Sequence, residues 1–136
     1  MVLQIDIELP ALGRGFHLIT QNIARLLPIL PESGMFHLHI LHTSAGLSIN
    51  ENADPSVLVD YESFFNHIVP ERMPFITHDM EGDDDMPAHI KASLVGNSIS
   101  VPIRNGSLLL GTWQGIYLCE FRDHPHRRKL VASIYE

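Results

Sequence analysis

Apolar and polar residues alternate through three segments of the chain, and this period-two pattern predicts strands with one buried face. The segments are residues 2–9, 35–42 and 98–103. In the second segment Phe36, Leu38 and Ile40 share one face, whereas His37 and His39 share the other. Less regular apolar segments predict further strands at 16–19, within 108–121 and at 129–135.

Capping residues and prolines predict three helices between these strands, at 20–30, 54–68 and 87–96. Pro28 lies inside the first helix and is expected to end it early. Asp54-Pro55 is a favourable start for the second helix, because a capping residue precedes proline at the first helical position. The apolar side of that helix consists of Leu58, Tyr61, Phe65 and Ile68.

The order of these elements predicts one α+β domain over residues 1–136. We expect a mainly antiparallel β-sandwich or barrel-like sheet with about three helices. Asn105-Gly106 predicts a tight hairpin turn between two of the strands. Apolar runs such as Leu108–Leu110 are too short to span a membrane. The N-terminus alternates and has no signal-peptide block, so we expect a cytoplasmic location.

Charge and cysteine content narrow the possible partners and sites. The net charge of −7 disfavours a nucleic-acid partner, which a basic face would normally attract. Cys119 is the only cysteine, so it forms no intramolecular disulfide and no multi-cysteine zinc cluster. Its apolar surroundings predict a small core residue. Any metal must therefore be held by histidine, aspartate or glutamate, and the chain has nine histidines.

His42 continues the inward parity of Phe36, Leu38 and Ile40, so it is expected to point toward the core. An inward titratable group needs a partner, which is either a backbone carbonyl or a metal. The small residues from Thr43 through Ser44 to Gly46 follow it and would let a ligand approach the backbone.

His78 and His89 bracket an acidic loop that contains five carboxylates. One interpretation is a solvated loop. The other is a metal site, because three neutral imidazoles and a water form a known catalytic zinc arrangement. The carboxylates would then orient the ligands or bind a harder ion such as Mg²⁺.

Four further polar residues are candidates for catalysis. Asn50 and Glu51 either belong to a loop or line a site next to His42. Gln114 and Glu120 are buried acid–base candidates if they face the core with Ile116 and Leu118, and are exposed if Trp113, Tyr117 and Phe121 face it instead. The sequence leaves both pairs of alternatives open.

Three separated segments resemble the signature segments of the YjbQ-like family, also called the secondary thiamine-phosphate synthase family. They are HTSAGLSINENADPSV (42–57), GDDDMPAHIKASLVG (82–96) and GTWQGIYLCEFRDH (111–124). The resemblance implies a β-rich α+β homotrimer with a divalent metal, most often zinc, at His42, His78 and His89. The family's other polar positions correspond to Ser44, Asn50, Glu51, Asp54, Gln114 and Glu120.

The resemblance also implies weak thiamine-phosphate synthase activity, which joins hydroxymethylpyrimidine diphosphate to thiazole phosphate. Release of pyrophosphate requires charge neutralisation by Mg²⁺ and basic side chains. The basic candidates are Lys91, Arg104, Arg122, Arg127 and Arg128. We expect Glu120, Gln114, Asn50 and Glu51 to act in catalysis, and Ser44, Thr43, Lys91 and Arg122 to bind the phosphorylated small molecule. A metal-dependent hydrolase and a non-catalytic trimeric metal-binding module remain alternatives.

Overall fold

The computed structural model describes residues 1–136 and contains two antiparallel sheets. The larger sheet has the strand order β1-β8-β3-β5-β6. Its strands are β1 (Val2–Glu8), β8 (Lys129–Tyr135), β3 (Ser33–Ile40), β5 (Ser98–Arg104) and β6 (Ser107–Leu108). The smaller sheet has the order β2-β7-β4, with β2 (Gly15–Leu18), β7 (Gln114–Glu120) and β4 (Ala45–Glu51). These sheets confirm the predicted α+β class.

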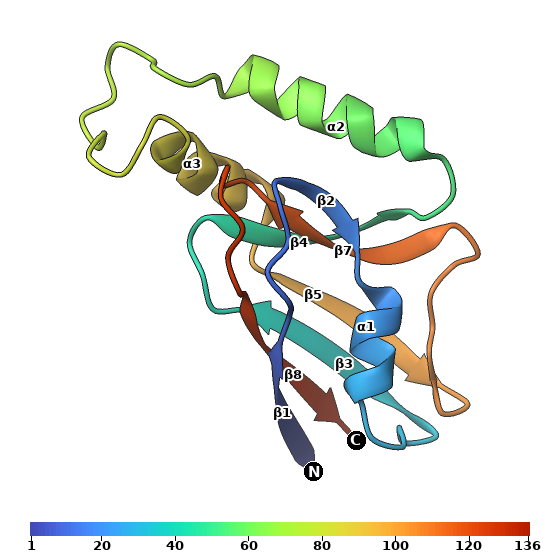
Figure 1. Cartoon of the computed structure of the whole chain (residues 1–136). Helices are drawn as coiled ribbons and strands as arrows, with labels where there is room; N and C mark the ends of the chain where they lie inside the picture. The colour runs from blue at the N-terminus through green and yellow to red at the C-terminus, as the bar shows by residue number, and fades with distance from the viewer.

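The elements form three layers (Figure 1). The five-stranded sheet and the three-stranded sheet enclose the main core, to which α1 (Thr20–Leu26) contributes the fully buried Ile23. The helices α2 (Pro55–Ile68) and α3 (Asp85–Val95) cover the outer face of the three-stranded sheet. No helix is long and apolar enough to cross a lipid bilayer.

β7 is the central strand of the smaller sheet, and both of its faces are covered. Ile116 and Leu118 belong to the main core, whereas Tyr117 and Cys119 belong to a second core under α3. Both predicted faces are therefore buried from Gly115 to Phe121, whereas Gln114 and Trp113 at the start of the strand are exposed, so Gln114 is not the buried acid–base candidate that the first alternative required. Cys119 is a core residue as expected, and burial raises the pKa of its thiol to about 12.

Local signals explain where the helices begin and end. α1 ends before Pro28, as predicted. The carboxylate of Asp54 accepts the Ser56 N–H at the start of α2. α3 begins at Asp85, two residues earlier than predicted, and ends before Gly96 at a φ of 104°. Pro87 is compatible with this earlier start, because the first N–H groups of a helix have no intrahelical partner.

The strand boundaries differ from the sequence predictions mainly at chain reversals. β3 covers residues 33–40 and not 35–42, so it ends two residues before His42. Asn105 and Gly106 form the predicted turn between β5 and β6, with φ values of 53° and 73°. Both residues are in the left-handed region that a type I′ turn requires.

The turn provides a test of this backbone geometry. Replacing Gly106 with Ala places a Cβ in the left-handed region, which we expect to lower the free energy of unfolding by about 1–2 kcal/mol. Gly13→Ala is the matched control, because a Cβ there meets no atom within 4 Å and φ is not in the left-handed region. Urea denaturation measures both, and an equal effect of the two substitutions would contradict the assigned turn.

Candidate metal centre

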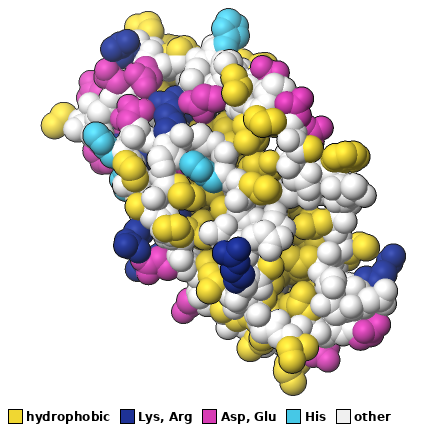
Figure 2. Space-filling model, turned by 45° about the vertical axis from the view of Figure 1, so that its right-hand side comes forward, with side chains coloured by type: hydrophobic (Ala, Val, Ile, Leu, Met, Phe, Trp, Pro, Cys, Tyr) yellow, Lys and Arg dark blue, Asp and Glu magenta, His cyan; other side chains and the backbone are white.

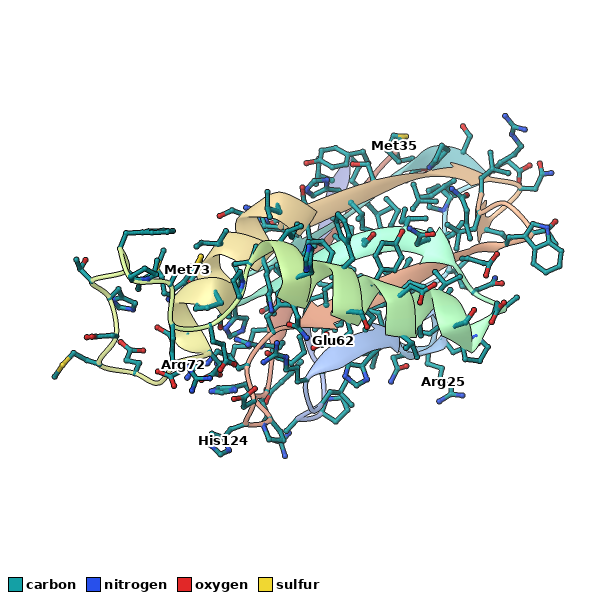
Figure 3. The ribbon with its side chains drawn as sticks, turned by 90° about the horizontal axis from the view of Figure 1, so that it is seen from above. Arg25, Met35, Glu62, Arg72, Met73 and His124 are labelled. Carbon is teal, nitrogen blue, oxygen red and sulfur yellow. The ribbon has the colours of Figure 1, made fainter.

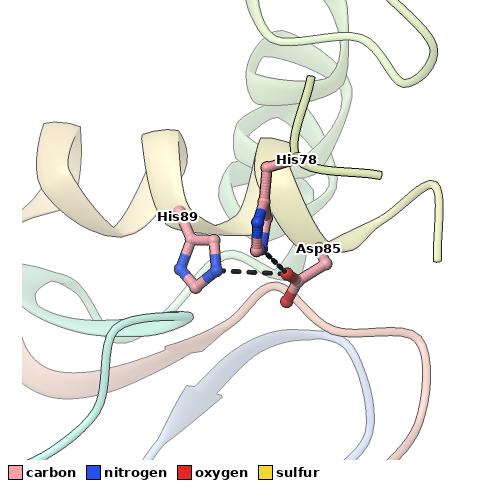
Figure 4. A group of neighbouring side chains, drawn as sticks. All are labelled: His78, Asp85 and His89. Carbon is pink, nitrogen blue, oxygen red and sulfur yellow. Dashed lines mark hydrogen bonds and ion pairs between the residues drawn. The ribbon is translucent and has the colours of Figure 1, made fainter. Parts of the chain in front are cut away.

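His78, Asp85 and His89 converge at the start of α3 (Figure 4). The Nε2 atom of His78 lies 2.8 Å from Oδ2 of Asp85, and Nε2 of His89 lies 3.2 Å from the same oxygen. One ligand atom from each of the three residues lies within 4.8 Å of the other two. Residues far apart in the acidic loop thus present two imidazole nitrogens and a carboxylate to one point.

The first turn of α3 explains this convergence. Asp85 and His89 are four residues apart, so they share one face of the helix. Gly82 adopts a φ of 107° in the loop before the helix, and its carbonyl accepts the Asp85 N–H at 3.3 Å. The chain reverses here, and His78 returns to the helix face.

Arg122 holds the carboxylates of this turn in place. Its Nη1 lies 2.8 Å from Oδ1 of Asp85, and its Nε donates to Oδ2 of Asp84 at 2.8 Å. Oδ2 of Asp85 therefore faces the two imidazoles. Burial opposes ionisation of Asp84, but hydrogen bonds from the Asp123 N–H and from Arg122 outweigh it and lower the pKa of this carboxyl.

The hydrogen bonds of His89 indicate that the cluster requires a proton or a cation between this ring and Asp85. Its Nδ1 lies 2.8 Å from the Thr43 carbonyl oxygen, so this nitrogen carries a proton. Nε2 is then the ring nitrogen that faces Oδ2 of Asp85. Two acceptors at 3.2 Å require a proton or a metal cation between them. Two imidazoles and a carboxylate are a familiar ligand set for catalytic zinc and for non-haem iron.

His42 lies outside this cluster. It follows the end of β3 and is half-buried, and its Nε2 accepts the Lys129 N–H at 2.8 Å. Nδ1 of the neutral ring therefore carries the proton. Burial and the nearby Arg128 lower the pKa of His42, which favours the neutral ring. Of the three predicted histidine ligands, only His78 and His89 therefore lie in the cluster. Its third group is the carboxylate of Asp85.

A pocket of about 430 Å³ connects His42 with His89. Thr43, Ser93 and Asn97 supply polar lining, and the remaining lining residues are small alanines and a glycine. Neither lysine nor arginine lines this pocket. A small molecule bound here would lie beside the histidine–carboxylate cluster, and an anionic one would depend on a metal for charge balance.

Two of the expected functional residues belong to a buried ion pair. Glu120 is fully buried, and its carboxylate accepts from Nε and Nη2 of Arg128 at 2.6 and 2.5 Å. Arg128 also donates to the Ser44 hydroxyl at 3.1 Å. Arg128 thus joins the end of β7 to the residue before β4, and neither Glu120 nor Ser44 lines the pocket.

Three other expected residues lie at the opposite end of β4 from Ala45, which lines the pocket. Asn50 donates to the Tyr61 hydroxyl, and Glu51 accepts the Asp54 N–H at 3.3 Å. Gln114 pairs with Glu51 across the strands and accepts the Gly111 N–H. The structure therefore does not bring these residues to the histidine cluster.

Two of the expected substrate-binding basic residues already have partners within the protein. Lys91 is 2% exposed and donates to Oδ1 of Asn66 at 2.7 Å, and its burial lowers the pKa of its ammonium group. Arg122 is paired with Asp84, which precedes α3, and with Asp85, the first residue of α3. The four-residue spacing of Asp85 from His89 places both residues on one helix face, but in the sequence it does not set Asp85 apart from its acidic neighbours until the start of the helix is known.

The comparisons agree on one family. The model described as "UPF0047 protein YjbQ-like" matches residues 5–136. The UPF0047 protein YjbQ of Salmonella typhimurium is 50% identical over 133 residues, 96% of each chain, and that of Escherichia coli O157:H7 is 45% identical over the same shares. A crystal structure of a conserved hypothetical protein from Thermus thermophilus has a TM-score of 0.81 and 32% identity, covering 93% of this chain and 97% of that one. These names state no reaction, so the reaction must be argued from the site.

The buried ion pair gives one prediction. Arg128→Met leaves the Glu120 carboxylate buried without its partner, and we expect it to lower the free energy of unfolding by roughly 3–5 kcal/mol. The double variant Glu120→Leu/Arg128→Met removes both charges and should recover most of that loss. Thermal and urea unfolding of the three proteins would test this, and a double variant no more stable than the single one would contradict it.

The cluster gives a second prediction. We expect Zn²⁺ titration by calorimetry to show one site, with an affinity lowered at least about 100-fold in Asp85→Asn or His89→Ala, more than loss of a supporting hydrogen bond costs. His67→Ala, an exposed histidine of α2, is the control. His42→Ala distinguishes the two ligand sets. Because Lys129 N–H engages its Nε2, we expect little change, and a loss as large as that of His89→Ala would restore His42 as a ligand.

Proposed function

The chain belongs to the UPF0047 YjbQ-like family, and on this basis we propose that it is a divalent-metal-dependent enzyme acting on a small molecule. The observation that carries the proposal is the convergence of His78, His89 and Asp85 beside a pocket. A metal bound there would act as a Lewis acid and neutralise developing negative charge. Zinc is the first candidate because the donors are imidazole and carboxylate.

The protein's own residues have distinct parts in this proposal. Arg122 holds one oxygen of Asp85 and leaves the other for the imidazoles. The Thr43 carbonyl fixes the His89 ring through Nδ1. The neutral His42 ring, whose Nε2 is occupied, is a hydrogen-bond donor through Nδ1 and is suited to hold a substrate oxygen. These contacts orient the groups before a substrate arrives, which is the main requirement for stabilising a transition state.

We propose thiamine-phosphate synthesis as the reaction within this class, on the strength of the family resemblance. The hydroxymethylpyrimidine diphosphate would place its leaving pyrophosphate against the metal, with Mg²⁺ as a further counterion. The pocket lining carries no lysine or arginine, so the charge of the leaving group would depend on metal ions. The same lining favours a second candidate, metal-dependent hydrolysis of a less highly charged phosphate ester or a lactone.

Complementation tests the first reaction. We expect the wild-type chain and His67→Ala to restore growth without thiamine in a strain that lacks its main synthase, whereas Asp85→Asn fails. Equal growth with Asp85→Asn would contradict the role of the cluster. Purified protein with Zn²⁺ or Mn²⁺ and a panel of phosphate esters and lactones tests the second reaction, which is rejected if turnover does not exceed that of Asp85→Asn.

Assembly and location stay predictions. Exposed apolar side chains form a discontinuous band on one face (Figure 2), and Val59 and Phe64 of α2 are 64% and 57% exposed. Such surface is what subunit contacts in the proposed homotrimer would cover. The cytoplasmic location and the phosphorylated substrate are likewise part of the proposal.

A further inference from the structure

A second cavity lies between α2 and the outer face of the three-stranded sheet. Its volume is about 160 Å³, and the rings of Phe16, Tyr61, Phe65 and Tyr117 line it. It shares no lining residue with the pocket between His42 and His89. The cavity is therefore separate from the candidate metal centre.

The cavity exists because α2 packs only loosely against the sheet. No residue of the helix is buried, and Leu58, Tyr61 and Phe65 on its inner side are only half-buried. Figure 3, seen from above, shows α2 lying across the sheet with Glu62 on it. Polar contacts hold the helix, including the 2.8 Å ion pair of Glu62 with Arg14. Because protein interiors are normally close-packed, unfilled space under a helix is suited to a ligand.

The size and lining of the cavity favour one aromatic ring. In another protein, an engineered apolar cavity of about 150 Å³ binds benzene. Here Phe16 stacks on Tyr61 with centroids 5.5 Å apart and on Phe65 at 6.0 Å. A further ring in the adjoining space would gain the same offset-stacked or edge contacts.

Two hydroxyls of the cavity have a proton that can be donated to a ligand. The Ser48 hydroxyl makes no hydrogen bond within the protein, and the Tyr61 hydroxyl accepts from Asn50, which leaves its own proton to donate. The Tyr117 hydroxyl is already used, since it donates to the Glu51 carbonyl at 2.6 Å. None of the lining residues is charged. The uncharged lining favours a neutral ligand, and the two hydroxyls can donate to an acceptor on its edge.

We propose that this cavity binds a neutral single-ring azine, an aromatic six-membered ring with at least one ring nitrogen that accepts a hydrogen bond. The ring lies against Phe16 and Phe65, and its nitrogen accepts from the Ser48 hydroxyl. Binding requires neither the metal nor the reaction proposed above, so each can fail without the other.

Pyrazine, benzene and cyclohexane are the probes, because they have nearly the same size and differ in aromaticity and acceptors. Each is titrated into the metal-free full chain and followed by amide and methyl NMR. We expect pyrazine to shift resonances of the lining residues and to bind about two- to tenfold more tightly than benzene, the range that one hydrogen bond supplies. Cyclohexane should bind most weakly. Shifts spread evenly over the surface, or equal affinities for all three probes, would overturn the proposal.

Matched variants locate the site. Leu58→Trp fills the cavity and should lower pyrazine affinity at least about tenfold, which corresponds to about 1.4 kcal/mol. Val59→Trp, one residue along and exposed, should leave it unchanged. Ser48→Ala should reduce pyrazine to the affinity of benzene, and His89→Ala should have no effect. Should Leu58→Trp lose its dispersed spectrum, Val95→Phe fills the same cavity from α3. Unchanged affinity in the folded filling variant would overturn the proposal.

Discussion

Arg122 forms ion pairs with both Asp84 and Asp85, and through them it ties the end of β7 to the first turn of α3. The guanidinium is planar with donors in a fixed fork, so it holds the two carboxylates in one arrangement. Asp85 is thereby fixed with one oxygen toward the imidazoles. His78 and His89 both lie within hydrogen-bonding distance of that oxygen, so the arrangement of the cluster rests on the carboxylate that Arg122 holds.

Much of the fold follows from local patterns, and the site follows only partly. Alternation located β1, β3 and β5, and Asn105-Gly106 located the hairpin, because these signals act between neighbouring residues. The alternation of inward and outward side chains predicted that His42 points toward the core. This alternation holds only within a strand, and the strand ends at Ile40. Asp85 could not be distinguished from the other loop carboxylates, because its selection depends on Arg122, which is 37 residues further along the chain. The pairing of Glu120 with Arg128 likewise requires knowledge of how β7 and the segment before β8 meet.

β4 has a different environment at each end. Ala45 adjoins the pocket next to the histidine cluster, whereas Ser48 and Asn50 line the aromatic cavity under α2. α3 contributes to both, through Ser93 and Val95 respectively. The polar residues of the family's motifs are thus divided between two regions. Asn50 is better explained by its hydrogen bonds near α2 than by a role at the candidate metal centre, to which it does not extend.

The single thiol of the chain has a practical consequence. Cys119 is fully buried in the second core, where burial raises the pKa of its thiol to about 12. The thiolate is the form that reacts with alkylating agents and oxidants, and at neutral pH the folded chain offers almost none of it. Modification of this sulfur therefore requires the layer of α2 and α3 to separate from the sheet. The rate at which a thiol reagent labels Cys119 consequently reports how often that layer opens.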